Sequence, residues 1–220
     1  MSFLVVANFK SNKSLDQVEA WLKSVPKTPN VVVAPSFLHL PLATKLWGSA
    51  VCSQDVSPFP SGAYTGAVNA TQLKDLGISY SLIGHSERRH YFHESVVEIA
   101  NKAKELLEVG ITPIICMEDS EIVTQFGALE DELVSKCHYC FEPRDIIGGT
   151  NIADLNVIES TINKIKSFAP SSIPMYGGSV NQHNIGELIK LGLGGTIVSS
   201  ACLDADNFKS LLSQIPHEKN

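Results

Sequence analysis

The sequence predicts an α/β fold, a single (β/α)8 barrel with eight parallel strands, and three observations lead to it. Short β-branched or apolar runs recur eight times along the 220 residues. A segment with helical periodicity follows each run. Several runs are almost continuously hydrophobic, as in parallel sheets that are buried on both faces. Because eight such units in this length suit a closed barrel better than an open sheet, we expect residues 1–220 to form one domain.

Each expected strand is an apolar run that ends at a polar residue, a glycine or a proline. The first run is broken at Asn8 and Lys10 and has no basic segment before it, so it is predicted to be a strand rather than a leader. The units average about 27 residues, so the barrel should be compact. The strands are expected at 3–8, 31–34, 50–53, 80–83, 112–116, 137–141, 173–176 and 195–198, and the helices at 15–23, 38–46, 69–76, 95–109, 122–134, 155–168, 181–191 and 205–214.

Composition excludes several classes of protein. With 44% hydrophobic residues the chain can bury a sizeable core, which excludes a disordered chain. Seventeen basic against 23 acidic side chains give a net charge of −6, so no nucleic-acid partner is expected. No segment approaches ~20 uninterrupted apolar residues, so no membrane association is expected. Five cysteines, an odd number, suit thiols in a reducing compartment, and a cytoplasmic location is predicted.

In a (β/α)8 barrel the functional residues lie where the strands end, so the strand exits are the candidate sites. The first strand runs into Asn8 and Lys10, which alternation would place on one face. The fourth ends in Gly-His85-Ser-Glu87-Arg-Arg, where a ring at a helix N-terminus is expected to stay uncharged. The sixth ends in Glu142-Pro143, and the glycines that follow predict a loop able to swing.

The last two strand exits are rich in small residues. Gly-Gly-Ser179 follows the seventh strand and Ser199-Ser200 follows the eighth. Together they predict a site for an anionic, phosphate-bearing ligand. Cys137 and Cys140 lie three apart in one strand, so their sulfurs should point to opposite faces and bind no shared metal ion.

These motifs, with Gly-Ala-Tyr-Thr65-Gly in a long loop, resemble the signatures of the triosephosphate isomerase family in the same order along the chain. The resemblance implies interconversion of dihydroxyacetone phosphate and glyceraldehyde 3-phosphate in glycolysis and gluconeogenesis. It implies that Glu142 is the base and that His85 is the neutral electrophile, the pairing known for this family. Lys10 would offset negative charge, and Asn8 would help to position the substrate.

The resemblance also implies roles around these groups. Glu87 would orient Lys10, and Cys116 would lie behind the catalytic residues. Neither a metal nor an organic cofactor is expected, because the substrate carbonyl already accepts the electrons. A homodimer is expected through the loop that carries Thr65, with a tetramer left open. The phosphate would rest on Gly148, Ser179, Ser199 and Ser200, and the lid would include Pro143, Ile147 and Gly149.

The sequence departs from the family pattern at four places. Ser199-Ser200 replaces a glycine pair, Arg144-Asp145-Ile146 replaces the usual lid tip, Ala67 replaces an interface glutamate, and the segment after Cys116 is short. Two alternatives therefore stay open. One is another phosphosugar isomerase or aldolase-like barrel enzyme, and the other is a weakly active or non-catalytic phosphate-binding protein.

Overall fold

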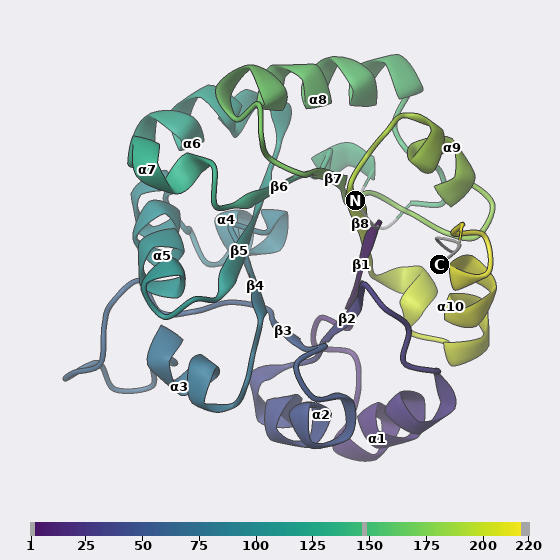
Figure 1. Cartoon of the computed structure of the whole chain (residues 1–220), viewed down its shortest axis with the longest axis horizontal. Helices are drawn as coiled ribbons and strands as arrows, with labels where there is room; N and C mark the ends of the chain where they lie inside the picture. The colour runs from purple at the N-terminus through teal and green to yellow at the C-terminus, as the bar shows by residue number, and fades with distance from the viewer. Residues whose placement is uncertain (1–2, 147–148, 217–220) are drawn as a thin grey trace.

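The computed structural model describes residues 3–146 and 149–216, and its strands form one closed ring surrounded by helices (Figure 1). Every strand pairs in parallel with its neighbours, in the order β2-β1-β8-β7-β6-β5-β4-β3. The strands are β1 (Leu4–Asn8), β2 (Val31–Ala34), β3 (Cys52–Ser53), β4 (Tyr80–Ile83), β5 (Thr112–Met117), β6 (His138–Phe141), β7 (Pro174–Tyr176) and β8 (Gly195–Val198).

The ring closes between β2 and β3 through a single parallel bridge. Val33 pairs with Val51, and the Val33 amide donates to the Ala50 carbonyl at 3.1 Å. The strand expected at 50–53 is therefore reduced to Cys52–Ser53 and this bridge. The predicted (β/α)8 barrel of eight parallel strands is confirmed.

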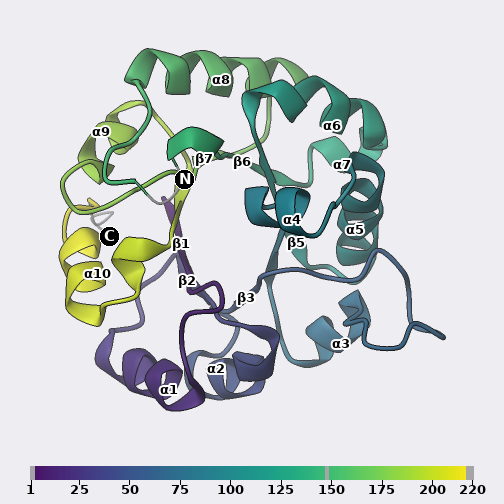
Figure 2. The same ribbon diagram turned by 180° about the vertical axis from the view of Figure 1, so that it is seen from behind.

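The helices form an outer layer around the ring of strands (Figures 1 and 2). The α-helices are α1 (Leu15–Ser24), α2 (Leu40–Trp47), α3 (Ala70–Asp75), α4 (Ser86–Tyr91), α5 (Val96–Glu108), α6 (Ile122–Ala128), α7 (Asp131–Val134), α8 (Leu155–Phe168), α9 (Ile185–Lys190) and α10 (Ala205–Leu212). Short 3₁₀ helices are η1 (Phe37–His39), η2 (Asp119–Glu121), η3 (Arg144–Ile146) and η4 (Ser200–Cys202).

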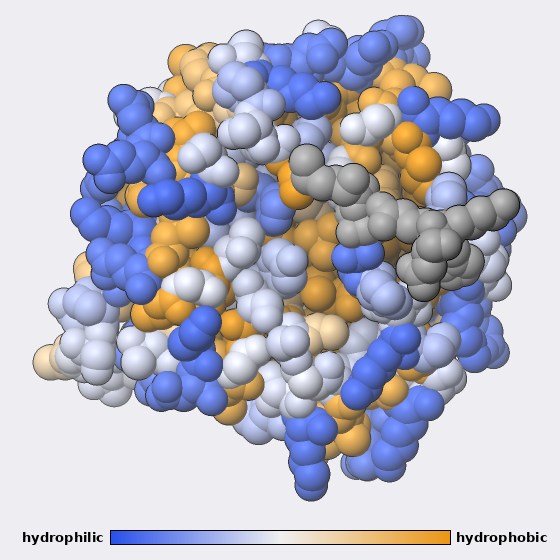
Figure 3. Space-filling view, in the orientation of Figure 1, coloured by the Kyte–Doolittle hydropathy of each residue, from blue (hydrophilic) through white to orange (hydrophobic). Residues whose placement is uncertain are grey.

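Helix α1 illustrates how the local sequence defines an element. The Ser14 side chain accepts from the Gln17 amide while the Gln17 side chain accepts from the Ser14 amide, which satisfies two amides at the helix start. Val18, Trp21 and Leu22 are the buried face. Figure 3 shows the side of the molecule away from the site, where hydrophilic side chains gather around the rim.

Alternation along the strands divides the core into two layers. Residues such as Val6, Cys116 and Ile197 belong to the apolar cluster inside the barrel. Their neighbours Val5 and Val198 belong to the larger cluster between strands and helices. Side chains therefore fill the interior of the barrel, and the space for a ligand lies at the carboxyl ends of the strands.

Three helices differ from the sequence expectation. The segment 122–134 breaks at Leu129, which is extended and buried between α6 and α7. Helix α9 starts at Ile185 because the Asn184 side chain accepts from the Asn181 amide and donates to the Ser179 carbonyl, which makes a turn. Helix α4 is not among the expected helices, since none of its residues is buried and it has no apolar periodicity. No described helix is long and apolar enough to cross a membrane.

Candidate active site

The carboxyl ends of the strands surround a cavity of about 190 Å³. Figure 2 looks onto this end of the barrel, with α4 in front of the ring. The strand exits of β1, β4, β6, β7 and β8 all contribute to the cavity, as predicted. Its lining consists of Lys10, His85, Glu142, Gly149, Thr150, Gly177, Gly178, Ser179, Val180, Asn181, Ile197, Ser199, Ser200 and Ala201.

Lys10 is held in the cavity by its backbone and by its side chain. Its φ of 50° lies in the left-handed region, and its amide donates to Asn8 Oδ1 at 3.0 Å. The Gln54 side chain donates to the Lys10 carbonyl at 2.9 Å. Lys10 Nζ donates to Glu87 Oε1 at 2.6 Å, so the Glu87 carboxylate holds the ammonium in place.

Asn8 lies at the end of β1 and is only 3% exposed. Leu4 and Val6 belong to the cluster inside the barrel, whereas Ala7 and Phe9 belong to the outer layer, so alternation places Asn8 on the inner face. Lys10 lines the cavity just beyond the end of this strand. The Asn8 side chain accepts from the Lys10 amide and so stabilises the left-handed conformation of Lys10.

His85 is the residue that caps the N-terminus of α4. The sequence predicted a helix start beside this ring, although it predicted no range for the helix. The Glu87 amide donates to His85 Nδ1 at 3.2 Å, so that nitrogen acts as an acceptor. An imidazole that accepts at Nδ1 carries its hydrogen on Nε2 and is uncharged. Nε2 lies 3.4 Å from Glu142 Oε1. The ring can therefore donate from Nε2 into the cavity.

Glu142 follows β6 directly and is 2% exposed. Its amide donates to the Met117 carbonyl at 2.9 Å, which fixes its backbone to the neighbouring strand. One carboxylate oxygen accepts from the Ser86 amide, the first in α4, at 3.2 Å. A carboxylate with so little exposure keeps few contacts with water, and this favours its use as a base.

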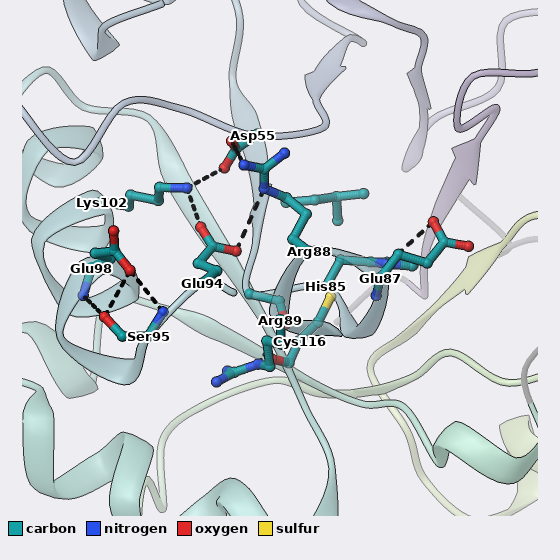
Figure 4. Close-up of polar contacts among 12 residues, drawn as sticks. Asp55, His85, Glu87, Arg88, Arg89, Glu94, Ser95, Glu98, Lys102 and Cys116 are labelled. Atoms are coloured by element: carbon teal, nitrogen blue, oxygen red, sulfur yellow. Dashed lines mark hydrogen bonds and ion pairs between the residues drawn. The ribbon is translucent and has the colours of Figure 1, made fainter. Parts of the chain in front are cut away.

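Helix α4 is anchored by a cluster of buried charges (Figure 4). Arg88 forms an ion pair with Asp55 at 2.7 Å, and Lys102 pairs with both Asp55 and Glu94. Burial raises the pKa of the Asp55 carboxyl, which Lys102 opposes. These contacts join the loop after β3 to α4 and α5, beside His85. This cluster was not predicted from the sequence, because its members are far apart in the chain.

Three of the four residues expected to bind phosphate line the same cavity. Ser179, Ser199 and Ser200 all line it, and η4 begins at Ser200. Ser179 has a φ of 51°, and its hydroxyl donates to the Ile146 carbonyl at 2.6 Å. Gly148, the fourth predicted phosphate ligand, lies outside the described residues.

The segment predicted to be a lid follows Glu142 directly along the chain. Pro143 precedes η3, and the Gly149 amide donates to the Ile146 carbonyl at 3.0 Å. Arg144 donates to His90 Nδ1 at 2.9 Å, so the lid contacts α4. Ile147 lies outside the described residues.

Cys116 lies near the end of β5 and is fully buried inside the barrel. Burial raises its pKa well above the ordinary value, and neighbouring Cys140 and Glu142 act in the same direction. Cys140 lies inside the barrel, whereas Cys137 lies in the outer layer. The prediction that these two sulfurs diverge is confirmed.

Three residues in the lining were not singled out from the sequence: Thr150, Asn181 and Ala201. Asn181 donates to the Thr150 carbonyl at 3.1 Å and to the Ser179 carbonyl at 3.3 Å, so it joins the lid to the loop after β7. Its position directly after the Gly-Gly-Ser-Val run was the available signal.

Known proteins resemble this chain along nearly all of its length. A family model described as triosephosphate isomerase matches residues 3–215. Three relatives carry the name triosephosphate isomerase. The one from Mesomycoplasma hyopneumoniae strain 232 is 30% identical, over 96% of this chain and 99% of its own. The one from the Wolbachia of Brugia malayi is 34% identical, over 98% of both chains. The one from Thermus thermophilus is 33% identical, over 95% of this chain and 97% of its own.

Proposed function

The chain belongs to the triosephosphate isomerase family, whose reaction interconverts dihydroxyacetone phosphate and glyceraldehyde 3-phosphate, and we propose that Glu142, His85 and Lys10 perform that reaction here. One observation carries the proposal. A buried carboxylate, an imidazole Nε2 and an ammonium all line a single cavity of about 190 Å³.

Glu142 is the base of the proposed mechanism. It takes a proton from the carbon next to the substrate carbonyl and later returns that proton to the adjacent carbon. The electron pair of the broken C–H bond passes to the carbonyl oxygen and gives an enediol or enediolate. Because Glu142 is 2% exposed, its carboxylate is poorly hydrated and better suited to remove a carbon-bound proton.

His85 and Lys10 act on the oxygens. The Nε2 hydrogen of an uncharged ring is donated to the carbonyl oxygen as negative charge develops there. The Lys10 ammonium, fixed by Glu87 at 2.6 Å, offsets the charge of the intermediate and of the phosphate. Asn8 contributes by stabilising the Lys10 backbone, and Cys116 contributes by packing behind Glu142.

The phosphate is proposed to lie against Ser179, Ser199, Ser200 and Gly148. The loop from Pro143 through Ile147 to Gly149 is proposed to be the lid. Closure of such a lid excludes water from the intermediate, with Ile197 on the opposite wall. The hydrogen bond from the Ser179 hydroxyl to the carbonyl of Ile146, a lid residue, supports a direct link between the lid and the phosphate site.

A homodimer is the proposed assembly, with Thr65 at the interface. The loop between β3 and α3 projects away from the barrel (Figure 1) and carries stacked, exposed Phe59 and Tyr64, with ring centroids 4.6 Å apart. A cavity of about 480 Å³ beside Lys10 and Glu87 could receive such a loop from a second copy. We also propose that residues 1–220 form one domain and that the protein is cytoplasmic.

A coupled assay of the two triose phosphates tests the proposed roles. Glu142→Gln keeps the size of the side chain but removes the base, so kcat should fall by at least about a thousandfold. Glu142→Asp and His85→Ala should also lower kcat, while inorganic phosphate should still bind to all three variants. Near-normal turnover by Glu142→Gln would remove Glu142 from its assigned role.

A further inference from the structure

We propose that Cys116, Cys140 and Glu142 form a binding site for a thiophilic divalent cation of the zinc and cadmium class, and that an ion bound there inhibits the enzyme by occupying the Glu142 carboxylate. The ion is an inhibitor and takes no part in isomerisation. The binding half of the proposal stands on the geometry alone. The inhibition half rests on Glu142 being the base.

The register of the sheet brings the three groups together. Cys116 and Cys140 are paired residues on β5 and β6, and both side chains point inside the barrel. Glu142 follows two positions after Cys140. The two sulfurs and a carboxylate oxygen all lie within 4.8 Å of one another. A tetrahedral zinc ion, with ligands at about 2.0–2.3 Å, needs them about 3.5–3.8 Å apart, so only a small contraction is required.

The kind of donor selects the kind of ion. Two thiolates favour soft or borderline cations such as Zn²⁺ and Cd²⁺ and disfavour Mg²⁺ and Ca²⁺, which prefer oxygen. With a doubly charged ion, two thiolates and one carboxylate leave a single negative charge. The Arg89 guanidinium, which donates to the Cys116 carbonyl at 2.9 Å, lies beside the site and reduces the electrostatic cost of that charge.

An ion can reach the site from the substrate cavity. Glu142 and Gly177 both line the cavity. A Cβ placed on Gly177 would lie 3.1 Å from Cys140 Sγ and 3.1 Å from Glu142 Oε1, so the sulfur and the carboxylate both lie beside this glycine of the cavity wall. Glu142 would bind the incoming ion first, and the fourth coordination position would face the cavity and hold water.

Binding exchanges protons for the ion. Two S–H bonds break, two sulfur–metal bonds form, and two protons leave to solvent, while no group is oxidised or reduced.

The test is a titration of the whole protein with Cd²⁺, read by the ultraviolet thiolate-to-cadmium charge-transfer band and by turnover. The wild type should bind one ion at this site and lose activity, and EDTA should restore it. Cys140→Ala and Cys140→Ser should each raise the Cd²⁺ concentration for half-maximal binding at least about tenfold. Cys137→Ala is the matched control. This variant has as many thiols as Cys140→Ala, but the thiol that it lacks lies in the outer layer. It should bind Cd²⁺ and lose activity as the wild type does.

Glu142→Gln separates this proposal from the assigned role of Glu142. This variant should raise the Cd²⁺ concentration at which the charge-transfer band is half-maximal, whatever its effect on turnover. The proposal is overturned if the wild type shows no band, or if the band and the inhibition persist unchanged in both Cys140 variants. Cadmium that binds at the two thiols without lowering turnover would refute the inhibitory half.

Discussion

The position of the Lys10 ammonium depends on two contacts that act on different atoms. Asn8 accepts from its amide, and Glu87 accepts from its Nζ at 2.6 Å. Glu87 also contacts His85, because the Glu87 backbone amide donates to His85 Nδ1. A side-chain substitution at Glu87 therefore removes support from Lys10 while the contact to the ring stays.

Glu87→Gln should lower kcat/KM by about tenfold to a hundredfold, because a displacement of the Lys10 ammonium by about 1 Å is enough to slow the reaction by up to about a hundredfold. Steady-state kinetics with both triose phosphates measures the effect. Glu130→Gln is the control, since it breaks the exposed Lys104–Glu130 pair far from the cavity. Equal kinetics in the two variants would show that Lys10 needs no partner.

The turn from β4 into α4 decides where the His85 ring lies. Gly84 has a φ of 66°, and a Cβ there would meet Arg89 at 2.8 Å and the Cys116 carbonyl at 3.1 Å. Arg89 itself donates to the Gly84 carbonyl at 2.7 Å. The turn is therefore packed on both sides, and a side chain at Gly84 must move β5 or α4.

Gly84→Ala should lower the free energy of unfolding by about 1–2 kcal/mol, from the strain of the left-handed backbone alone. It should also lower kcat at least about tenfold, because it displaces His85. Gly127→Ala, in α6, is the same change where nothing lies within 4 Å of the new Cβ, and it should stabilise by about 0.5–1 kcal/mol. Urea unfolding and kinetics measure both effects. A stable and fully active Gly84→Ala would contradict the packing described for the turn.

Strand β6 begins with a histidine that opposes folding in acid. Burial lowers the pKa of His138, and its Nδ1 has no partner among the described residues. As the pH falls through the unfolded value of ~6.5, the unfolded chain takes up this proton before the folded one. Stability is therefore lost as the pH falls below that value.

His138→Gln should flatten the loss of stability between about pH 7.5 and about pH 5.5, a range that spans the unfolded pKa of ~6.5. The free energy of unfolding in urea, measured across this range, checks it. His183→Gln, at an exposed position, should leave the slope of the wild type unchanged. If His138→Gln has the wild-type slope, the acid sensitivity arises elsewhere.

Much of the barrel could be predicted from the sequence because its strands are short, apolar and regularly spaced. Val31–Ala34, Tyr80–Ile83 and Leu155–Phe168 have the expected limits. The extent of α4 could not be predicted beyond its start at His85, since this helix is attached through charges rather than an apolar face. Its ion pairs join Arg88 to Asp55 and Glu94, and sequence distance hides such partners.

The site was predictable to the same extent. The rule that function lies at strand ends located Lys10, His85 and Glu142, which all line the cavity. The left-handed backbone of Lys10, which the Asn8 side chain supports, could not be predicted, because nothing in the strand pattern marks such a conformation. The rule also gave no sign that Cys140 would face Cys116, which depends on the register between two strands.

The proposed dimer places an exposed loop of each copy against the other. Phe59 and Tyr64 are 45% and 43% exposed, and such apolar side chains are typical of interfaces. Tyr64→Asp should shift the protein from dimer to monomer at micromolar concentration and lower its activity, as light scattering after gel filtration would show. Leu38→Asp, at another exposed apolar position, should leave the mass unchanged. A wild type that is monomeric would contradict the assembly.

Hydrogen exchange at substrate carbon tests the role of Glu142 most directly. Dihydroxyacetone phosphate is incubated with the enzyme in D₂O, and NMR follows deuterium entering the carbon next to the carbonyl. The wild type should introduce deuterium there, and Glu142→Gln should do so at least about a thousandfold more slowly. Exchange by Glu142→Gln at close to the wild-type rate would mean that another group removes the proton.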